Sequence, residues 1–322
     1  MNAFSPIQVP LIQTAGAYPD ISNDDYHGRE ICPAPSISST GLKKLVGAIG
    51  LQTKGATPRH YWEGSALNPN RRPQEKTDAL RLGSAFHDAL LLPELWQDRN
   101  VYHVTPEGFS RSKTKAMASE IADADAAEAA GCVIITADER DQIDAMVAAM
   151  RANPLVNAVL SDGEAETTLA WQDKETGVWL RARPDWMPKR KHIGINVKTT
   201  TDASHSGFQS DVTKYRYAMS AALELDGIEA VFGSRPGNYL HPTIEKPAKG
   251  AWQAGDYMPV ALWELPADDI EYGRAMNRRA IRIFADCLSA DRWPGYADEP
   301  AMCGISPWMR KSIDMAFEGE AA

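Results

Sequence analysis

In the first half of the chain, apolar residues recur with a helical period. The strongest pattern runs from about Thr77 to Leu92, where apolar side chains stand three and four residues apart, and Pro93 ends it. Ser38–Thr40 and Thr57-Pro58 are helix-start signals for two shorter helices before it. The pattern also predicts helices within Ser110–Ala130, Asp138–Met150 and Pro154–Leu160, and a brief strand at Cys132–Thr136.

A period of two takes over further along the chain. It predicts strands at Ala165–Gln172, Val178–Trp186 and His192–Thr199, with the turn Asp173–Gly177 joining the first two into a hairpin. Later segments are predicted as helices from Asp202, over Lys214–Leu225 and over Ala267–Leu288, and as strands near Glu229–Ser234 and Tyr257–Leu265. This order favours an α/β fold in which a central mixed sheet is flanked by helices.

The domain organisation predicted from the sequence is simple. With 322 residues, 43% of them hydrophobic, the chain can bury one large core. Residues 1–35 are rich in Pro, Ser and Asn, so we expect an extended N-terminal arm that Tyr26 and Ile31 attach to the body. Residues 36–310 are predicted to form a single domain, and residues 311–322 a C-terminal tail.

Charge and cysteine content narrow the functional classes. The net charge is −9, so the protein as a whole repels nucleic acid, and a DNA enzyme of this charge needs a local basic groove. The four cysteines are scattered without a C-x-x-C pair, which is typical of reduced thiols and does not favour a zinc site. No long apolar run and no secretory leader is visible, so we expect a cytoplasmic protein that does not enter a membrane.

Two of the predicted strands carry the residues of a metal-dependent hydrolase. Asp185 follows Pro184 at the end of one strand, and Asn196, Val197 and Lys198 lie on the next. Carboxylates bind Mg²⁺, or Mn²⁺ in its place, and two-metal sites of this kind activate water and stabilise the leaving oxygen in phosphodiester hydrolysis. Lys198 shares a strand face with position 196, so its ammonium is suited to orienting the attacking water or neutralising transition-state charge.

Other residues extend this candidate site. The main-chain carbonyl of Val197 is a further candidate metal ligand, and Glu166 on the preceding strand is the nearest additional carboxylate. His87 stands four residues after Gly83 on one helix face, which makes its imidazole a candidate ligand. Taken singly, a P-D pair is more often a turn and a helical histidine more often structural, so only the combination indicates catalysis.

A local basic surface is predicted beside these strands. Lys189, Arg190 and Lys191 lie in the turn between the two strands that carry the motif. Arg181 and Arg183 share strand parity with Asp185, so we expect both to face the same side and to bind phosphate.

Several motifs resemble one nuclease family. GSAFHDALLLPE, TGVWLRARPDWM, NVKTT, KYRYAMSAALELDG and CLSADRWPGY, between Ser38 and Trp308, resemble the RecE-type exonucleases (exonuclease eight and its phage relatives). These belong to the PD-(D/E)XK superfamily and are close to the RecB nuclease domain. The resemblance implies a restriction-endonuclease-like α/β/α core and Mg²⁺-dependent 5′-to-3′ digestion of linear double-stranded DNA. It also implies a bacterial or phage-encoded recombination protein, a ring-shaped homo-oligomer and a single-strand annealing protein as partner.

The resemblance assigns roles residue by residue. His87 matches the G-x-x-x-H histidine, Glu166 the acidic residue before the hairpin, Asp185 the P-D aspartate and Lys198 the lysine of the third motif. Asn196, however, stands where the family has a metal-binding Asp.

The downstream helix motif departs from the family as well. Tyr215 and Tyr217 of a Y-x-x-Q-type motif remain as candidate DNA contacts, whereas Ser220 stands where Gln is expected.

The amide at position 196 leaves two functions open. One is an exonuclease, active as it stands or held in an inactivated or trapped form because Asn196 lacks the charge of the acid. The other is a catalytically degenerate nuclease fold that binds DNA ends or a recombination partner. A third reading, an unrelated α/β enzyme, has little support, because no P-loop, G-x-S-x-G or H-E-x-x-H motif is present.

Overall fold

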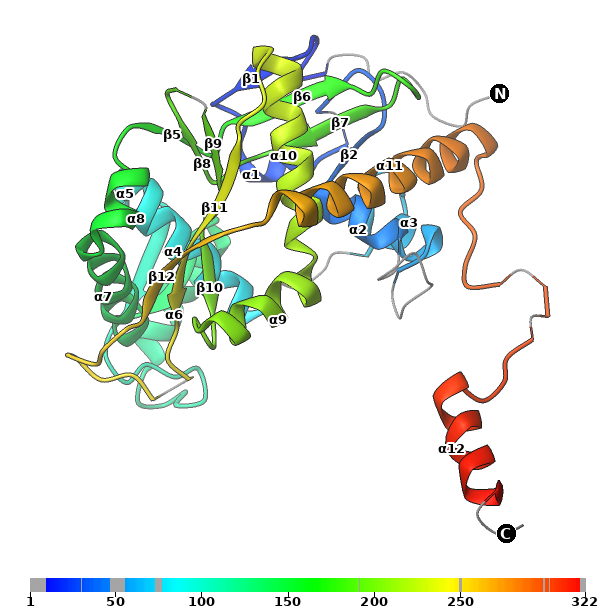
Figure 1. Cartoon of the computed structure of the whole chain (residues 1–322). Helices are drawn as coiled ribbons and strands as arrows, with labels where there is room; N and C mark the ends of the chain where they lie inside the picture. The colour runs from blue at the N-terminus through cyan, green and yellow to red at the C-terminus, as the bar shows by residue number, and fades with distance from the viewer. Residues whose placement is uncertain are drawn as a thin grey trace.

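A computed structural model of the protein describes residues 10–29, 31–46, 56–72, 77–190, 192–248, 251–297, 299–300 and 302–318. Within these ranges the architecture is a set of β-sheets with helices packed around them (Figure 1). None of the helices in the described ranges is both long enough and apolar enough to cross a bilayer.

The largest sheet is mixed and contains six strands. Its spatial order is β10 (Lys198–Thr200), β11 (Asn238–Glu245), β9 (Ile193–Ile195), β8 (Trp186–Pro188) and β5 (Gly163–Ala165), and β12 (Val260–Glu264) also pairs with β11. Strands β9 and β10 both run parallel to β11 and pair with successive parts of it. They are therefore two pieces of one strand, interrupted at Asn196 and Val197.

A second sheet of four strands contains the predicted hairpin. Its order is β1 (Gly16–Tyr18), β6 (Thr168–Gln172), β7 (Trp179–Ala182) and β2 (Ser36–Ser38). Strands β6 and β7 are antiparallel, which confirms the hairpin. Segments from the predicted arm form β1 on one edge and α1 (Asn23–Tyr26), and both Tyr26 and Ile31 are buried, as expected for points of attachment. The division into arm, domain and tail stays a prediction.

Two hydrophobic clusters hold the helices in place. The first surrounds the β6–β7 hairpin and includes buried residues of α2 (Ser39–Leu45), α3 (Pro58–Gly64), α10 (Tyr217–Phe232) and α11 (Ala267–Ala290). The second lies against the six-stranded sheet and includes residues of α4 (Asp78–Leu91), α5 (Pro93–Gln97), α7 (Ala137–Ala152) and α8 (Pro154–Val159). The remaining elements are the pair β3 (Tyr102–Thr105) and β4 (Val133–Thr136), α6 (Ala118–Ala129), α9 (His205–Tyr215) and α12 (Pro307–Glu318). Figure 1 shows α12, at the end of a long link, away from the rest of the chain.

Most helices lie where the apolar pattern predicts them, but one predicted strand is wrong. The segment Glu229–Ser234 does not form a strand, because α10 continues to Phe232 and ends at Gly233, which adopts a left-handed φ of 80°. Within this segment Ala230 and Phe232 are exposed, and only Val231 packs, partly buried, against the cluster around the hairpin. The strand that follows is β11, which begins five residues later at Asn238.

The predicted strands near the motif are each divided in two. Residues 165–172 separate into β5 and β6 at Glu166, which has a φ of 53°, and residues 178–186 separate into β7 and β8. Glu166 and Asp185 lie in these breaks, outside the regular strands. The directions of their side chains therefore do not follow the alternation of a β-strand.

The crossing of α10 and α11 depends on a glycine, and this yields a first prediction. A Cβ on Gly273 would lie 2.2 Å from the carbonyl oxygen of Ala218, an atom of the facing backbone. We expect Gly273→Ala to lower the free energy of unfolding by about 1–3 kcal/mol, the usual cost of overpacking. Gly83→Ala is the matched control, since nothing lies within 4 Å of the new Cβ and a helix-interior alanine stabilises by about 0.5–1 kcal/mol. Urea unfolding of both variants checks this, and equal stability of Gly273→Ala and wild type would contradict it.

Candidate metal centre

Pairing between β8 and β9 brings the two motif segments together. Trp186 stands opposite Ile195, so the preceding Asp185 lies beside the break that contains Asn196 and Val197. The main-chain N–H of Val197 donates a hydrogen bond of 2.7 Å to Oδ2 of Asp185. Asp185 is thus fixed from the neighbouring strand by a backbone donor, and its side chain is nearly buried.

Three predicted ligands converge on one point. Ligand atoms of His87, Glu166 and Asp185 all lie within 4.8 Å of one another. His87 reaches the cluster from α4, with Nδ1 3.5 Å from Oδ2 of Asp185. Glu166 reaches it from the break between β5 and β6, where its N–H donates to the main-chain oxygen of Asp185 at 3.2 Å. The structure therefore brings together ligands from a helix and two strand breaks.

Lys198 lies beside this cluster, as its position two residues after 196 predicts. Its Nζ is 3.9 Å from Oδ2 of Asp185 and donates a hydrogen bond of 2.9 Å to the main-chain oxygen of Val197. The ring of Tyr217 lies below the same ammonium, 5.3 Å away. The carbonyl of Val197, predicted as a metal ligand, therefore holds the lysine in this structure.

Asn196 occupies the centre of the site and is itself buried. Its Nδ2 donates to Oδ1 of Asp185 at 3.2 Å and to Oε1 of Glu224 at 3.3 Å. Its Oδ1 is buried and accepts no hydrogen bond from the described residues. The amide N–H group thus lies between two carboxylates, which is a position that suits a cation.

Sequence reasoning missed Glu224. It lies on α10 among buried apolar residues, is only 5% exposed, and accepts a hydrogen bond from the Tyr239 hydroxyl. The available signal was a lone acid in the apolar run Ala221–Leu225. The sequence alone does not show that this acid faces the site, because its position depends on how α10 packs against the sheet.

Lys43 was also missed. It lies on α2 and donates a hydrogen bond of 2.6 Å to the Oγ of Ser220, the residue that replaces the expected Gln. Burial, and then the nearby charge of Lys198, lowers the pKa of Lys43 to about 7. Ser220 also shares a hydrogen bond of 2.9 Å with Ser39. The α10 motif therefore binds a cationic side chain at this site.

The side chains of Lys43, Glu166, Asp185, Asn196, Lys198 and Glu224 line a polar pocket with a volume of about 300 Å³. Its lining residues are Asn23, Tyr26, His27, Ser38, Ser39, Thr40, Lys43, Glu166, Ala182, Arg183, Asp185, Asn196, Lys198, Tyr217, Ser220 and Glu224. Both acidic and basic side chains line it, which suits a ligand that carries both a metal ion and a phosphate.

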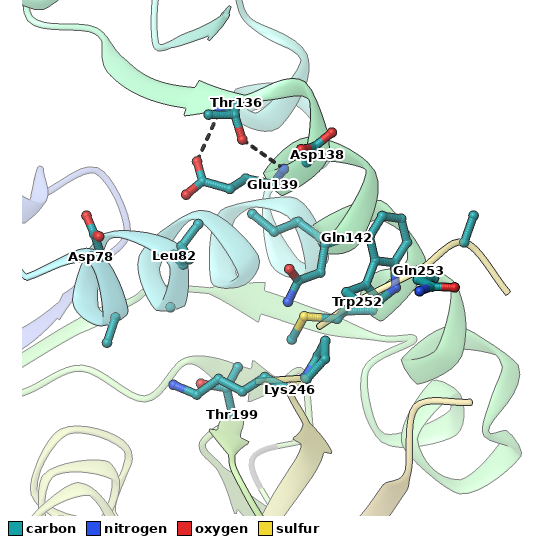
Figure 2. A pocket seen from close by; sticks show the side chains of 16 residues that line it. Asp78, Leu82, Thr136, Asp138, Glu139, Gln142, Thr199, Lys246, Trp252 and Gln253 are labelled. Atoms are coloured by element: carbon teal, nitrogen blue, oxygen red, sulfur yellow. Dashed lines mark hydrogen bonds between the residues drawn. The ribbon is translucent and has the colours of Figure 1, made fainter. Parts of the chain in front are cut away.

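A larger apolar pocket of about 820 Å³ lies elsewhere, between α4, α7 and the end of the six-stranded sheet (Figure 2). Gly83, on its wall, is one helical turn from His87. Its acid Glu139 is turned toward Thr136, with which it forms a reciprocal helix cap, and pairs with Arg81 at 2.6 Å. With no convergent ligand set among its described residues, this pocket does not carry the chemistry.

The two arginines expected to bind phosphate are engaged within the protein. Arg181 donates to the main-chain oxygen and hydroxyl of Ser36, and Arg183 donates to Thr168 and to the main-chain oxygen of Ile21. Both guanidinium groups also lie over the ring of Tyr26. These contacts favour a structural role for both, and their contact with DNA stays untested.

The basic turn between β8 and β9 is exposed but lies at the far end of both strands from the metal cluster. Lys189 forms an ion pair of 2.8 Å with Asp162, Arg190 lies on the surface, and Lys191 is outside the described residues. Tyr215, at the end of α9, is 46% exposed and stacks on Tyr217, with ring centres 5.7 Å apart. Their proposed role in DNA binding is not tested by these positions.

The electrostatics of the cluster fit a divalent cation. Burial, followed by the charge of Asp185, raises the pKa of Glu166, and burial chiefly raises that of Glu224. Burial also lowers the pKa of His87, which favours the neutral imidazole that binds metals. Glu224 is buried, whereas Glu166 is partly buried and lies 3.9 Å from Arg183. These two acids, a neutral imidazole and the unpartnered Oδ1 of Asn196 form an oxygen-rich donor set suited to Mg²⁺ or Mn²⁺.

Comparisons with known proteins agree with this architecture. Residues 38–305 match the PDDEXK-like domain of unknown function (DUF3799). Solved structures of similar fold include a candidate exonuclease from Eubacterium rectale, which is 13% identical, with 86% of this chain and 87% of that chain covered at a TM-score of 0.51. At this identity the likeness shows the fold alone. No curated protein matches the chain in sequence.

The raised pKa of Glu166 yields a second prediction. We expect Glu166→Gln to increase the free energy of unfolding of the metal-free protein at about pH 8, because folding there requires this partly buried carboxyl to hold a proton that the unfolded chain has already lost. A raised folded-state pKa means that the folded state binds more protons, so wild-type stability falls as pH rises above the ordinary value of 4.5. The gain should therefore disappear as pH falls toward 4.5.

Urea unfolding in a chelator, at both ends of this pH range, measures the effect. Glu164→Gln is the matched control, because Glu164 is an exposed glutamate on β5. A gain of equal size at both pH values, or a loss at the higher one, would contradict the electrostatic account.

Proposed function

The chain belongs to the PDDEXK-like family, and on that premise we propose that it is a nuclease that hydrolyses phosphodiester bonds with a divalent metal ion. One observation carries this proposal above the others. His87, Glu166 and Asp185 place their ligand atoms within 4.8 Å of one another, with the ammonium of Lys198 3.9 Å from Asp185. A ligand cluster beside a fixed cation is the arrangement that phosphodiester hydrolysis requires.

Each residue has a distinct part in the proposed reaction. His87, Glu166 and Asp185 would hold the metal, which supplies Lewis acidity and a lowered pKa for bound water. Lys198 is held by the Val197 carbonyl, so its ammonium is positioned to orient the attacking water and to offset charge on the phosphate. Lys43 and Tyr217 line the same polar pocket, where a cation and a ring can contact the strand beside the scissile bond.

The finer function follows the resemblance to RecE-type exonucleases. We propose that the substrate is linear double-stranded DNA, digested from 5′ to 3′ with Mg²⁺ (or Mn²⁺) in a two-metal-type reaction during phage-type homologous recombination. A ring-shaped homo-oligomer, a single-strand annealing protein as partner and a cytoplasmic location belong to the same proposal.

Asn196 supports a second candidate function. An amide at the position of a family acid lowers the negative charge of the site, so a fold of this kind can bind DNA ends or a recombination partner without cutting. Such a protein would bind DNA in a salt-sensitive manner without a metal requirement. Retention of His87, Glu166, Asp185 and Lys198 in one cluster favours the nuclease.

The third prediction concerns cleavage itself. With Mg²⁺ and 5′-end-labelled linear duplex DNA, we expect wild type to release nucleotides and Lys198→Met to lose at least about 100-fold in rate, as expected when a charge-stabilising group is removed. Lys174→Met is the matched control, since Lys174 is exposed in the β6–β7 turn, and it should cut at the wild-type rate.

Comparison with Asn196→Asp separates the two candidate functions. Nucleotide release by wild type supports the nuclease as it stands, and release by Asn196→Asp alone identifies an inactivated site. If neither protein releases nucleotides while both still bind DNA, the nuclease proposal would be overturned and the end-binding function would remain.

A further inference from the structure

We propose that Glu224 supplies the third carboxylate of the metal centre from helix α10, in place of the acid that position 196 lacks. The inference deepens the proposed nuclease function and rests on it for the identity of the reaction. The metal site itself can be tested without cleavage.

The carboxylate of Glu224 contacts the side chain of residue 196 directly. A single atom, Nδ2 of Asn196, donates to Oε1 of Glu224 at 3.3 Å and to Oδ1 of Asp185 at 3.2 Å. Both acceptors therefore face one small volume from opposite elements, α10 and the β7–β8 link. A cation in that volume would have a carboxylate oxygen on each side.

Glu224 is a buried acid without an ion pair among the described residues. Its side chain is 5% exposed, and among the described residues no lysine or arginine forms an ion pair with it. The Tyr239 hydroxyl satisfies one carboxylate oxygen and leaves the other directed toward Asn196. A buried carboxylate costs free energy unless it is paired or coordinates a metal, so a cation beside Glu224 would offset the cost of charging it.

The unpartnered oxygen of Asn196 is an independent indication of a ligand. Oδ1 is buried and accepts no hydrogen bond from the described residues, while Nδ2 binds the two acids. Rotating the amide by a half turn would exchange Oδ1 and Nδ2, and the amide oxygen would then face both carboxylates, so that a cation beside the three oxygen atoms could bind all of them. Hard divalent cations bind amide oxygens as well as carboxylates.

In this proposal Glu224 on α10 supplies the negative charge that an acid at position 196 would otherwise supply from the strand. Glu166, Asp185 and Glu224 provide three carboxylates in the polar pocket even though the strand acid is absent. Ser220, one helical turn before Glu224, lines the pocket from the same face of α10. The two departures from the family pattern, at 196 and 220, thus lie on either side of this glutamate.

Binding of Mn²⁺ to the full chain, measured by isothermal titration calorimetry, tests the proposal. We expect Glu224→Gln to weaken Mn²⁺ binding by at least about tenfold, and the double variant Asn196→Asp/Glu224→Gln to restore it by returning the charge to the strand. Glu94→Gln, at an exposed glutamate of α5, is the control and should bind Mn²⁺ like wild type. Unchanged binding by Glu224→Gln, or no Mn²⁺ binding by wild type, would overturn the proposal.

A second variant covers the case in which Glu224→Gln does not fold. Glu224→Asp keeps the charge but withdraws it by one methylene, and weaker Mn²⁺ binding is again expected, whereas wild-type affinity would overturn the proposal. DNA digestion separates this inference from the nuclease proposal. Glu224-dependent Mn²⁺ binding without cleavage refutes the nuclease alone, and cleavage that is indifferent to Glu224→Gln refutes the role of Glu224 alone.

Discussion

The carboxylate of Asp185 is the contact on which the candidate site depends. Its Oδ2 accepts the Val197 N–H at 2.7 Å and lies 3.5 Å from the imidazole of His87, and its Oδ1 accepts the amide of Asn196. These contacts join the β7–β8 link, the break between β9 and β10, and helix α4. Because the pairing of β8 with β9 sets the position of Asp185, the metal cluster is a consequence of sheet register.

The site keeps acidic groups in a buried environment at a cost to stability. Burial raises the pKa of both Glu166 and Glu224, so charging them in the absence of a cation opposes folding. Such destabilising arrangements persist where function requires them. The proposed function accounts for the position of Lys43 and Lys198 close to the acids, since a nuclease would hold a dication and receive phosphate in one place.

The sequence predicted which residues gather at the candidate site better than it predicted the elements around them. His87, Glu166, Asp185 and Lys198 could be identified because strand alternation and the resemblance placed them on adjacent segments, and the structure brings all four together.

Other features depend on tertiary packing that periodicity does not encode. Glu224 needed the packing of α10 against the sheet, and the segment predicted as a strand at 229–234 instead completes α10 and the link that follows it. Strand alternation predicted that Arg181 and Arg183 face the same side. It could not show that main-chain oxygens of neighbouring segments would accept hydrogen bonds from their guanidinium groups.

We propose that a divalent ion binds between α4 and the two strand breaks. Crystals of the protein soaked in Mn²⁺, examined by anomalous diffraction at the manganese edge, test this most directly. The account predicts a peak coordinated by His87, Glu166 and Asp185. The absence of any peak there, with Mn²⁺ bound elsewhere or not at all, would contradict it.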